Sequence, residues 1–178
     1  AVIEEAMALT SSGYQEIIIT GIHIGAYGKD LADGSFRLAD LIEAILNKCP
    51  ALPRLRISSI EESEIDDHLL SLMAREPRIA DHLHIPLQSG SQGVLQRMKR
   101  HYTTDDFLAK LAAIRTVRPD IAITTDVIAG FPGETEEEFQ ALCDFVQEAE
   151  FDDVGVFTYS QEEGTPAANM PDQIQEEV

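Results

Sequence analysis

The sequence contains no tryptophan, only two cysteines and no long run of apolar residues. Neither Cys49 nor Cys143 belongs to a CxxC or CxH spacing, which excludes a disulfide framework and a self-contained zinc or iron–sulfur motif. No stretch approaches about 18 consecutive apolar residues, and no basic segment precedes an apolar one as in a signal peptide. These absences predict a soluble protein of the reducing cytoplasm that does not enter a membrane.

Basic residues are scarce as well. The 13 lysines and arginines are outnumbered by 32 acidic residues, which gives a formal net charge of −19, and no basic residue follows Arg118. Affinity for a phosphate backbone comes largely from Lys and Arg that displace counterions, so a broad RNA-binding surface is disfavoured and any RNA contact is expected to be local. We interpret the acidic residues 119–178 as solvated faces. The alternative is a non-catalytic module that binds a basic partner through them.

Short runs rich in Ile, Val or Leu predict β-strands, and helical apolar patterns lie between them. The expected strands are residues 16–20, 55–60, 82–87, 121–128 and 154–159. This alternation is typical of βα units with a parallel sheet. A dinucleotide-binding sheet would need GxGxxG after its first strand, where the glycines are too few, so a β/α barrel is favoured over a doubly wound sheet. Length and composition fit a single domain over residues 1–178.

Three of the expected helices begin with a residue that can cap them, followed three positions later by an acid. These pairs are Ser63 with Asp66, Thr103 with Asp106, and Thr135 with Glu138. A further helical pattern occupies residues 2–9, before any expected strand. In a β/α fold such a helix follows a strand, so we expect a truncated barrel that lacks one strand upstream and has about five of six. The open edge of residues 16–20 would then favour self-association.

Polar segments follow all five expected strands. They are residues 20–30, 58–63, 86–91, 126–135 and 159–165. The working groups of parallel β/α folds gather beyond the carboxyl ends of the strands. We therefore expect these segments to form one rim that carries the site.

Two histidines within the third expected strand raise a metal site as one alternative. His82 and His84 stand at i and i+2, so both point to the same side of a strand, as two metal ligands would. With His23, Glu61 or Asp126 they would suit a metal-dependent β/α-barrel hydrolase. We favour the interpretation that they are inward histidines held by hydrogen bonds, because a metal site needs at least three ligands and supporting contacts.

Two other segments have the composition of ligand sites. GFPGE, residues 130–134, places two glycines around a proline just before a helix N-terminus, which lets backbone approach a ligand closely; a tight βα loop is the alternative. Arg97, Lys99 and Arg100 form the only dense basic cluster, which suits a carboxylate, a phosphate or an RNA strand; otherwise they complement the dipole of a short helix.

Five segments in this order resemble one family. They are ITGIHIGAYGKD, RLRISSIEESEI, HLHIPLQSGSQGVLQRMKRHYT, TTDVIAGFPGETEEEF and GVFTYSQEEGTPAA. Together they are similar to the radical S-adenosylmethionine (SAM) core of the methylthiotransferases, the MiaB/MtaB/RimO group, over essentially the whole chain. The resemblance implies a partial (β/α)6 TIM-like barrel that binds SAM and a [4Fe-4S] cluster. Reductive cleavage of SAM would yield a radical that abstracts hydrogen from the substrate before sulfur and methyl are added.

The departures from the family pattern are also informative. The family's CxxxCxxC cluster loop, its N-terminal domain with a second cluster and its C-terminal RNA-binding TRAM domain have no counterpart in these residues. We therefore expect this chain alone to hold no metal or cluster and to be inactive, whereas the intact parent would be an enzyme whose RNA affinity comes largely from the other domains.

The resemblance gives two substrates. The segments GIHIGAYG, RLRISSIEESEI and MKRHYT are most similar to the MtaB-like branch, which methylthiolates a modified adenosine of tRNA. GVFTYSQEEGTPAA is more similar to the RimO-like branch, which modifies an aspartate of a ribosomal protein. Three segments against one favour tRNA.

The resemblance also implies site residues. The cofactor-binding positions would be Gly21, Ser59, Glu61, Gln88, Asp126, Ile128, Gly130 and Phe131. Gly21 would meet the methionine amino group, Ser59, Glu61 and Gln88 would make polar contacts, and the remaining four would cradle the adenine. The basic cluster Arg97, Lys99 and Arg100 would contact the substrate.

Overall fold

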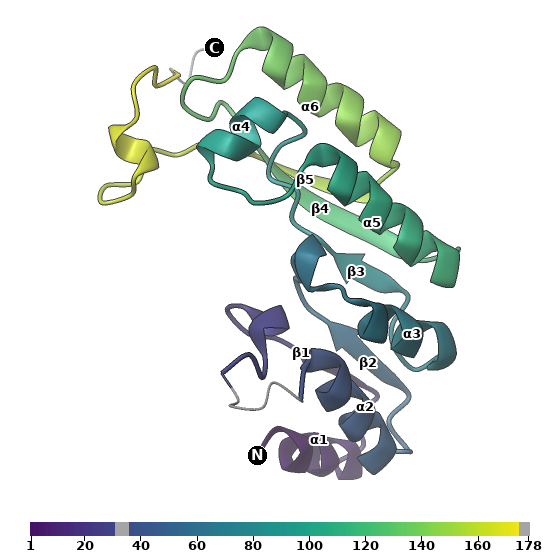
Figure 1. Ribbon diagram of the computed structural model, residues 1–178. Coiled ribbons are helices and arrows are strands. Elements are labelled where there is room, and N and C mark those ends of the chain that lie inside the picture. Colours follow the sequence, from purple (N-terminus) through teal and green to yellow (C-terminus); the bar gives the residue numbers. More distant parts are fainter. Residues whose placement is uncertain (31–35, 175–178) are drawn as a thin grey trace. The chain divides into compact units, whose positions relative to one another are not determined.

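The computed structural model describes residues 1–30 and 36–174, and these divide into two compact units. Unit 1 comprises residues 1–85 and 112–122, and unit 2 comprises residues 86–111 and 123–178. Each unit alternates parallel strands with helices (Figure 1). Among the described residues, no helix is long and apolar enough to cross a membrane.

Unit 1 repeats a strand–helix order after an opening helix. Its elements are α1 (Val2–Ser11), β1 (Glu16–Ile19), η1 (Ile24–Ala26), α2 (Leu38–Lys48), β2 (Arg54–Ile57), η2 (Glu62–Glu64), α3 (Asp67–Arg75) and β3 (His82–His84). Strands β1 and β2 are parallel, with Glu16 opposite Arg54. Parallel bridges from Leu55 to Ile79 and from Ser59 to His84 continue this order toward β3. The described strand pairs therefore confirm the parallel βα arrangement expected from the sequence.

The two faces of β1 and β2 differ in polarity because strand side chains alternate. Leu55 and Ile57 are almost completely buried in the core with the apolar stripes of α2 and α3. On the other face Glu16 pairs with Arg56 at 2.5 Å and with Arg54 at 3.2 Å. The hydrogen bond from Arg56 lowers the pKa of Glu16. This face is therefore charged rather than apolar.

Unit 2 contains the second group of elements. They are α4 (Gln92–Arg97), α5 (Thr104–Val117), β4 (Ala122–Ala129), α6 (Glu136–Ala149), β5 (Asp153–Thr158) and η3 (Ala167–Asn169), of which α5 and β4 each contribute residues to unit 1 as well. β4 and β5 are parallel, with Asp126 opposite Gly155. Phe107 is fully buried at the centre of an aromatic core, with its ring near those of Tyr102, Phe145 and Phe151.

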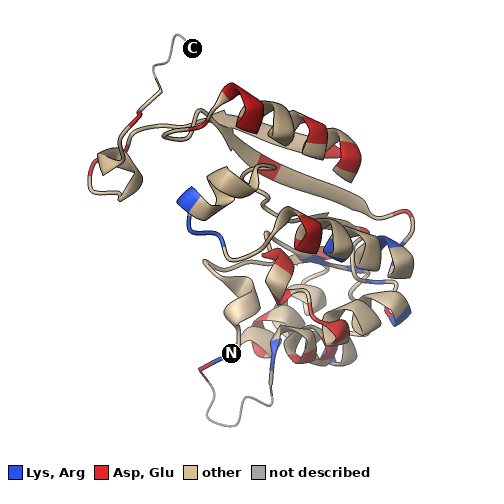
Figure 2. Ribbon diagram, turned by 45° about the horizontal axis from the view of Figure 1, so that its top comes forward, with Lys and Arg blue, Asp and Glu red and all other residues tan. Residues whose placement is uncertain are grey.

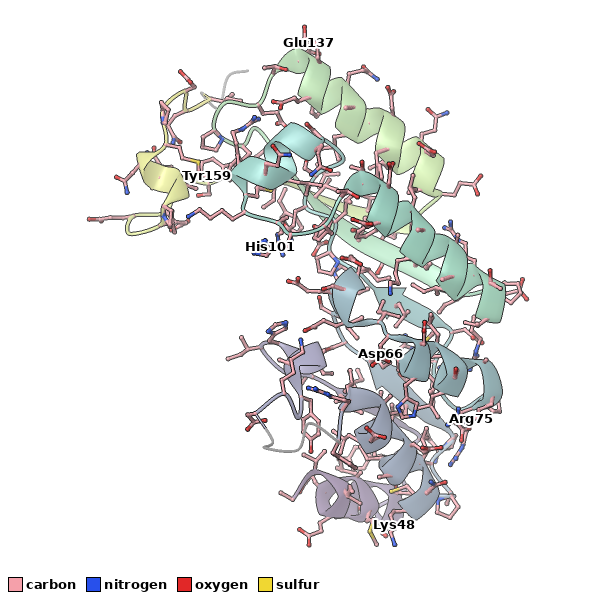
Figure 3. The ribbon with its side chains drawn as sticks, viewed as in Figure 1. Lys48, Asp66, Arg75, His101, Glu137 and Tyr159 are labelled. Carbon is pink, nitrogen blue, oxygen red and sulfur yellow. The ribbon has the colours of Figure 1, made fainter. Side chains whose placement is uncertain are left out.

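Local hydrogen bonds confirm two of the three expected helix starts. Thr103 and Asp106 bond reciprocally before α5, and Thr135 and Glu138 do the same before α6. The Ser63 prediction was wrong: Asp66 caps α3 by accepting the N–H of Leu69 at 2.8 Å (Figure 3). A separate 3-10 turn, η2, occupies the residues around Ser63, so the helix begins one turn later.

All five expected strands are present, with ends that shift by a few residues. β2 ends at Ile57 instead of Ile60, and β3 ends at His84 instead of Leu87. Pro86 has no N–H to donate, and the N–H of Leu87 is taken by the side-chain oxygen of Thr125 at 2.9 Å. The backbone of this segment therefore leaves the regular ladder before the expected end.

Candidate functional site

Three of the expected cofactor residues lie at strand ends in unit 1. Gly21 follows β1, and Ser59 and Glu61 follow β2. The N–H of Ser58 donates to the carbonyl of Ile19, which ties the end of β2 to the end of β1. Ser59 forms a bridge with His84, so the segments after β1, β2 and β3 begin at the same edge. Unit 1 therefore brings Gly21, Ser59 and Glu61 to one rim.

The loop after β1 is built around a buried carboxylate that the sequence did not single out. Glu64 has a side chain only 4% exposed, and its Oε1 accepts from His23 Nε2 at 2.6 Å and from Lys29 Nζ at 3.0 Å. Its Oε2 is buried and has no hydrogen-bond partner among the residues that the structure describes. A Cβ on Gly25 would collide with this side chain, so glycine is needed where the loop passes over it.

The other five expected cofactor residues lie at strand ends in unit 2. Gln88 is a non-glycine residue with φ of 68°, and its backbone bonds to Asp126 and to Ile128 on β4. Asp126 and Ile128 are two positions apart, so they share one face of β4, and both are half-buried. Gly155 lies opposite Asp126 on β5, and a Cβ there would collide with the Asp126 carboxylate.

The turn after β4 combines open backbone with an aromatic wall. Gly130 has φ of +77°, and no atom of the described chain lies within 4 Å of the position that a Cβ would take. Phe131 is 6% exposed, and its ring packs edge-on against Tyr159 with centroids 5.4 Å apart. The N–H of Gly130 donates to Glu134 Oε2 at 2.5 Å. A half-buried glycine with open space at its Cα, beside a buried ring, suits the edge and face of a nucleobase.

Glu134 holds this turn at an electrostatic cost. Burial raises the pKa of its carboxyl, and the hydrogen bond from Gly130 opposes that rise. Its Oε1 is buried and finds no hydrogen-bond partner in residues 1–30 and 36–174. The hydrogen bond from Gly130 to Glu134 therefore helps to fix the turn. The Glu134 carboxyl would ionise more easily in water than it does at this half-buried position.

The basic cluster is more constrained than expected for a substrate-binding surface. Arg97 forms a two-pronged pair with Glu138, at 3.1 Å and 2.5 Å, which joins α4 to α6 and lowers the pKa of Glu138. Lys99 adopts a left-handed backbone with φ of 57° at the exit of α4, and Arg100 bonds through its N–H to Leu95. Figure 2 shows basic residues at this end of α4 and acidic residues along α6.

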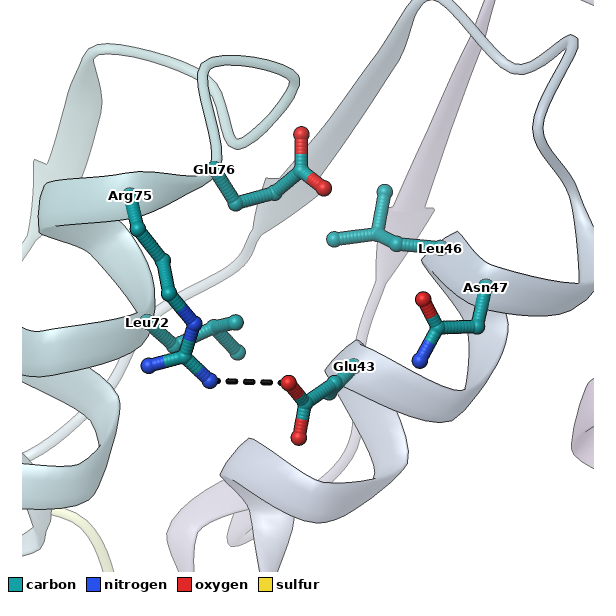
Figure 4. A pocket seen from close by; sticks show the side chains of 6 residues that line it. All are labelled: Glu43, Leu46, Asn47, Leu72, Arg75 and Glu76. Carbon is teal, nitrogen blue, oxygen red and sulfur yellow. Dashed lines mark hydrogen bonds and ion pairs between the residues drawn. The ribbon is translucent and has the colours of Figure 1, made fainter.

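A cavity of about 220 Å³ lies apart from these strand ends. It is lined by Glu43, Leu46, Asn47, Leu72, Arg75 and Glu76, from the last turns of α2 and α3 (Figure 4). Helices in βα units run opposite to the strands, so this cavity is at the amino ends of the strands, away from the rim. Glu43 pairs with Arg75 at 2.8 Å, and Glu76 pairs with Arg78 at 2.6 Å, so its main charges are already matched.

The structure gives no support to a metal site. His82 and His84 are both half-buried and flank the buried Leu83, which confirms that they share one face of β3. Within the part of the chain that is described, no group of three or more His, Cys, Asp or Glu side chains could hold a metal ion. Cys49 is buried at the end of α2 and Cys143 is exposed on α6, in different units. The hydrolase alternative is not favoured, and the residues present do not fit an iron–sulfur cluster.

The chain belongs to the radical SAM superfamily, whose family model matches residues 1–146. The methylthiotransferase resemblance is also confirmed: the chain is 47% identical over 177 residues to the threonylcarbamoyladenosine tRNA methylthiotransferase MtaB of Bacillus subtilis, covering 99% of this chain and 39% of the relative. It is 41% identical over 177 residues to the tRNA-2-methylthio-N(6)-dimethylallyladenosine synthase of Acetivibrio thermocellus, covering 99% of this chain and 36% of the relative. The chain thus spans less than two fifths of the length of these relatives.

Solved structures confirm the fold class. The coproporphyrinogen III oxidase HemN of Escherichia coli, a radical SAM enzyme, superposes with a TM-score of 0.65 at 17% identity, covering 99% of this chain and 40% of that one. Methylornithine synthase PylB gives a TM-score of 0.59 at 16% identity, covering 96% of this chain and 47% of that one. At these identities the likeness concerns the fold alone: an α/β, partial radical SAM barrel with parallel strands.

The sequence reasoning missed Glu64 and Gly155. Glu64 stands in the acidic run EESE, where nothing distinguishes it from Glu61 and Glu62. Its partners His23 and Lys29 come from the preceding strand end, so only the fold reveals the contact. Gly155 has no chemistry of its own, and its role depends on the register that places it opposite Asp126.

Proposed function

We propose that this chain is the SAM-binding core of a methylthiotransferase that adds a methylthio group to a modified adenosine of tRNA, as the MtaB relative is named to do. The supporting observation is the 47% identity to that relative over 177 residues, which is 99% of the chain. A tRNA substrate would place the protein in the cytoplasm. The low content of lysine and arginine is compatible with this function if RNA affinity comes from other parts of the enzyme.

The residues that would hold SAM fall into two sets. In unit 2, the Gly130 peptide and the buried Phe131 ring suit the adenine, beside Ile128 and Asp126 on β4. In unit 1, Gly21, Ser59 and Glu61 would contact the methionine and ribose. SAM bound in the intact enzyme would supply radical chemistry at an unactivated carbon of the substrate. The part of this chain would be to bind, orient and exclude water. Lys99 and Arg100 would contact the RNA, and Arg97 would brace them from its pair with Glu138.

A chimera tests the proposed function. The chain would replace the corresponding segment of the Bacillus subtilis relative, and tRNA from a strain that lacks the native enzyme would be digested and examined by mass spectrometry. We expect the methylthiolated threonylcarbamoyladenosine to reappear with the chimera. An Asp126→Ala chimera is the matched control and should restore much less. An expressed, folded chimera that restores none of the modified nucleoside would argue against the proposal.

A second experiment concerns the chain alone. Because its two cysteines lie in different units and neither belongs to a cluster spacing, we expect anaerobic reconstitution with iron and sulfide to leave no stoichiometric cluster. Iron analysis and visible absorbance are the measurements. We also expect no cleavage of SAM by the isolated chain under reducing conditions. Several equivalents of iron per chain, with a cluster absorbance band, would contradict this expectation.

A further inference from the structure

We propose that Glu64 is a positioning residue that holds the loop of residues 21–30 in the conformation that presents Gly21 to the cofactor. The cofactor part of this inference rests on the proposed function, while the loop part rests on geometry alone. All of the groups involved lie within unit 1.

The carboxylate of Glu64 contacts both ends of the loop. Glu64 Oε1 accepts from His23 near the start of the loop and from Lys29 near its end. One oxygen therefore closes a segment of seven residues, from 23 to 29, into a ring of contacts. The side chains of His23 and Lys29 are about half exposed, whereas the Glu64 carboxylate is buried, so the anchor of the loop lies on the buried side of these contacts.

Besides Glu64, residues 21–30 are held by contacts with Phe36, whose ring packs edge-on against Tyr27 with centroids 6.2 Å apart and whose carbonyl lies beside Gly28. The internal backbone bonds of the loop are short-range ones, from Ala26 to His23, from Tyr27 to Ile24 and from Lys29 to Ala26. Ile24 is buried, but Ile22, next to Gly21, is fully exposed. Glu64 supplies the polar anchor among these contacts, so its loss should increase local opening of the loop.

The second carboxylate oxygen of Glu64 also indicates a positioning role. Oε2 is buried without a hydrogen-bond partner among the described residues, and it lies against Gly25, where a Cβ would collide with it. An unsatisfied buried carboxylate oxygen is unfavourable for folding. The burial of Glu64 does not by itself stabilise the fold. We therefore infer that its role is to hold the loop in place.

The test uses hydrogen exchange of the chain without any cofactor. The informative amides are those of Ala26, Tyr27 and Lys29, which are bonded within the loop. In Glu64→Ala we expect their exchange to accelerate about tenfold while the amides of α6 are unchanged. A His23→Ala/Lys29→Ala variant removes the same clamp from its exposed side and leaves the buried Glu64 carboxylate without these partners, so it should be less stable and should also accelerate exchange in the same amides.

The matched control is Glu43→Ala, which removes a glutamate of unit 1 from an exposed pair with Arg75. It should leave the loop amides as in the unmodified chain. Titration calorimetry with SAM is the second measurement, and we expect the Kd to rise about fivefold in Glu64→Ala and to stay unchanged in Glu43→Ala.

The two measurements separate the possible failures. Unchanged loop exchange in His23→Ala/Lys29→Ala would overturn the role of Glu64. Faster exchange with an unchanged Kd would overturn the link from the loop to the cofactor. If the unmodified chain bound no SAM at all, the proposed function would lose support, while the exchange experiment would still decide whether Glu64 holds the loop.

Discussion

Two glutamates, the buried side chain of Glu64 in unit 1 and the half-buried Glu134 in unit 2, hold the segments that follow β1 and β4. Each has one oxygen bonded and the other buried with no hydrogen-bond partner in the described residues. Glu64 is bonded by two side chains, His23 and Lys29, at least 35 positions away, and Glu134 by a backbone N–H four positions away. The first therefore organises a loop through tertiary contacts, whereas the second stiffens a turn that is already local.

The largest expected difference between the two regions concerns their glycines. Gly25→Ala would place a methyl group against Glu64, and overpacking of this kind costs about 2 kcal/mol of the free energy of unfolding. Gly130→Ala meets open space, so only its positive φ counts and the cost should be about 1 kcal/mol. Urea denaturation of the two variants measures both values. Equal costs would break the comparison, because the crowding beneath Gly25 would then be without effect.

Arg97→Ala should have an intermediate effect, confined to unit 2. It removes the two-pronged partner of Glu138 and a positive charge that lowers the pKa of Glu134. Because both side chains are partly exposed, we expect a loss of about 1 kcal/mol in the free energy of unfolding. The pKa values of both glutamates should rise, which NMR titration of their carboxyl carbons would show. Arg97→Lys should restore the charge but not the paired geometry. An unshifted Glu134 would show that Arg97 does not act on the turn.

Glu134→Gln should give the smallest effect and one with a defined pH dependence. Because burial raises the pKa of Glu134 in the folded chain, its ionised form opposes folding, so its favourable contribution is present at low pH and is lost as the pH rises through the folded pKa. A glutamine keeps an acceptor for the Gly130 N–H and does not ionise. We therefore expect the variant to gain stability relative to the unmodified chain as the pH rises above the ordinary glutamate pKa. Thermal melts from acid to neutral pH are the measurement. If the variant lost stability relative to the unmodified chain as the pH rose, burial would not be the dominant influence on the pKa of Glu134.

The sequence was informative for two of the three local capping pairs, the exception being Ser63 with Asp66. The capping pairs before α5 and α6 bond three residues apart and were predicted correctly. The end of β3 was not, because Leu87 donates to Thr125, 38 positions along the chain. Glu64 was missed for the same reason, since its partners become neighbours only after β1 and β2 have paired. The expected SAM contacts, self-association through the β1 edge and the single-domain boundary remain predictions.

The register of β4 and β5 determines which residue is possible at position 155. Gly155 lies opposite Asp126, and any side chain at that position would displace the carboxylate. In a saturating mutational scan, position 155 should therefore lose function as sharply as a ligand-contacting position while tolerating no residue larger than glycine. Sequence comparison would assign such a column to a turn or a kink, yet it lies in the middle of a regular strand. The glycine at this position is explained by the space that the Asp126 carboxylate occupies.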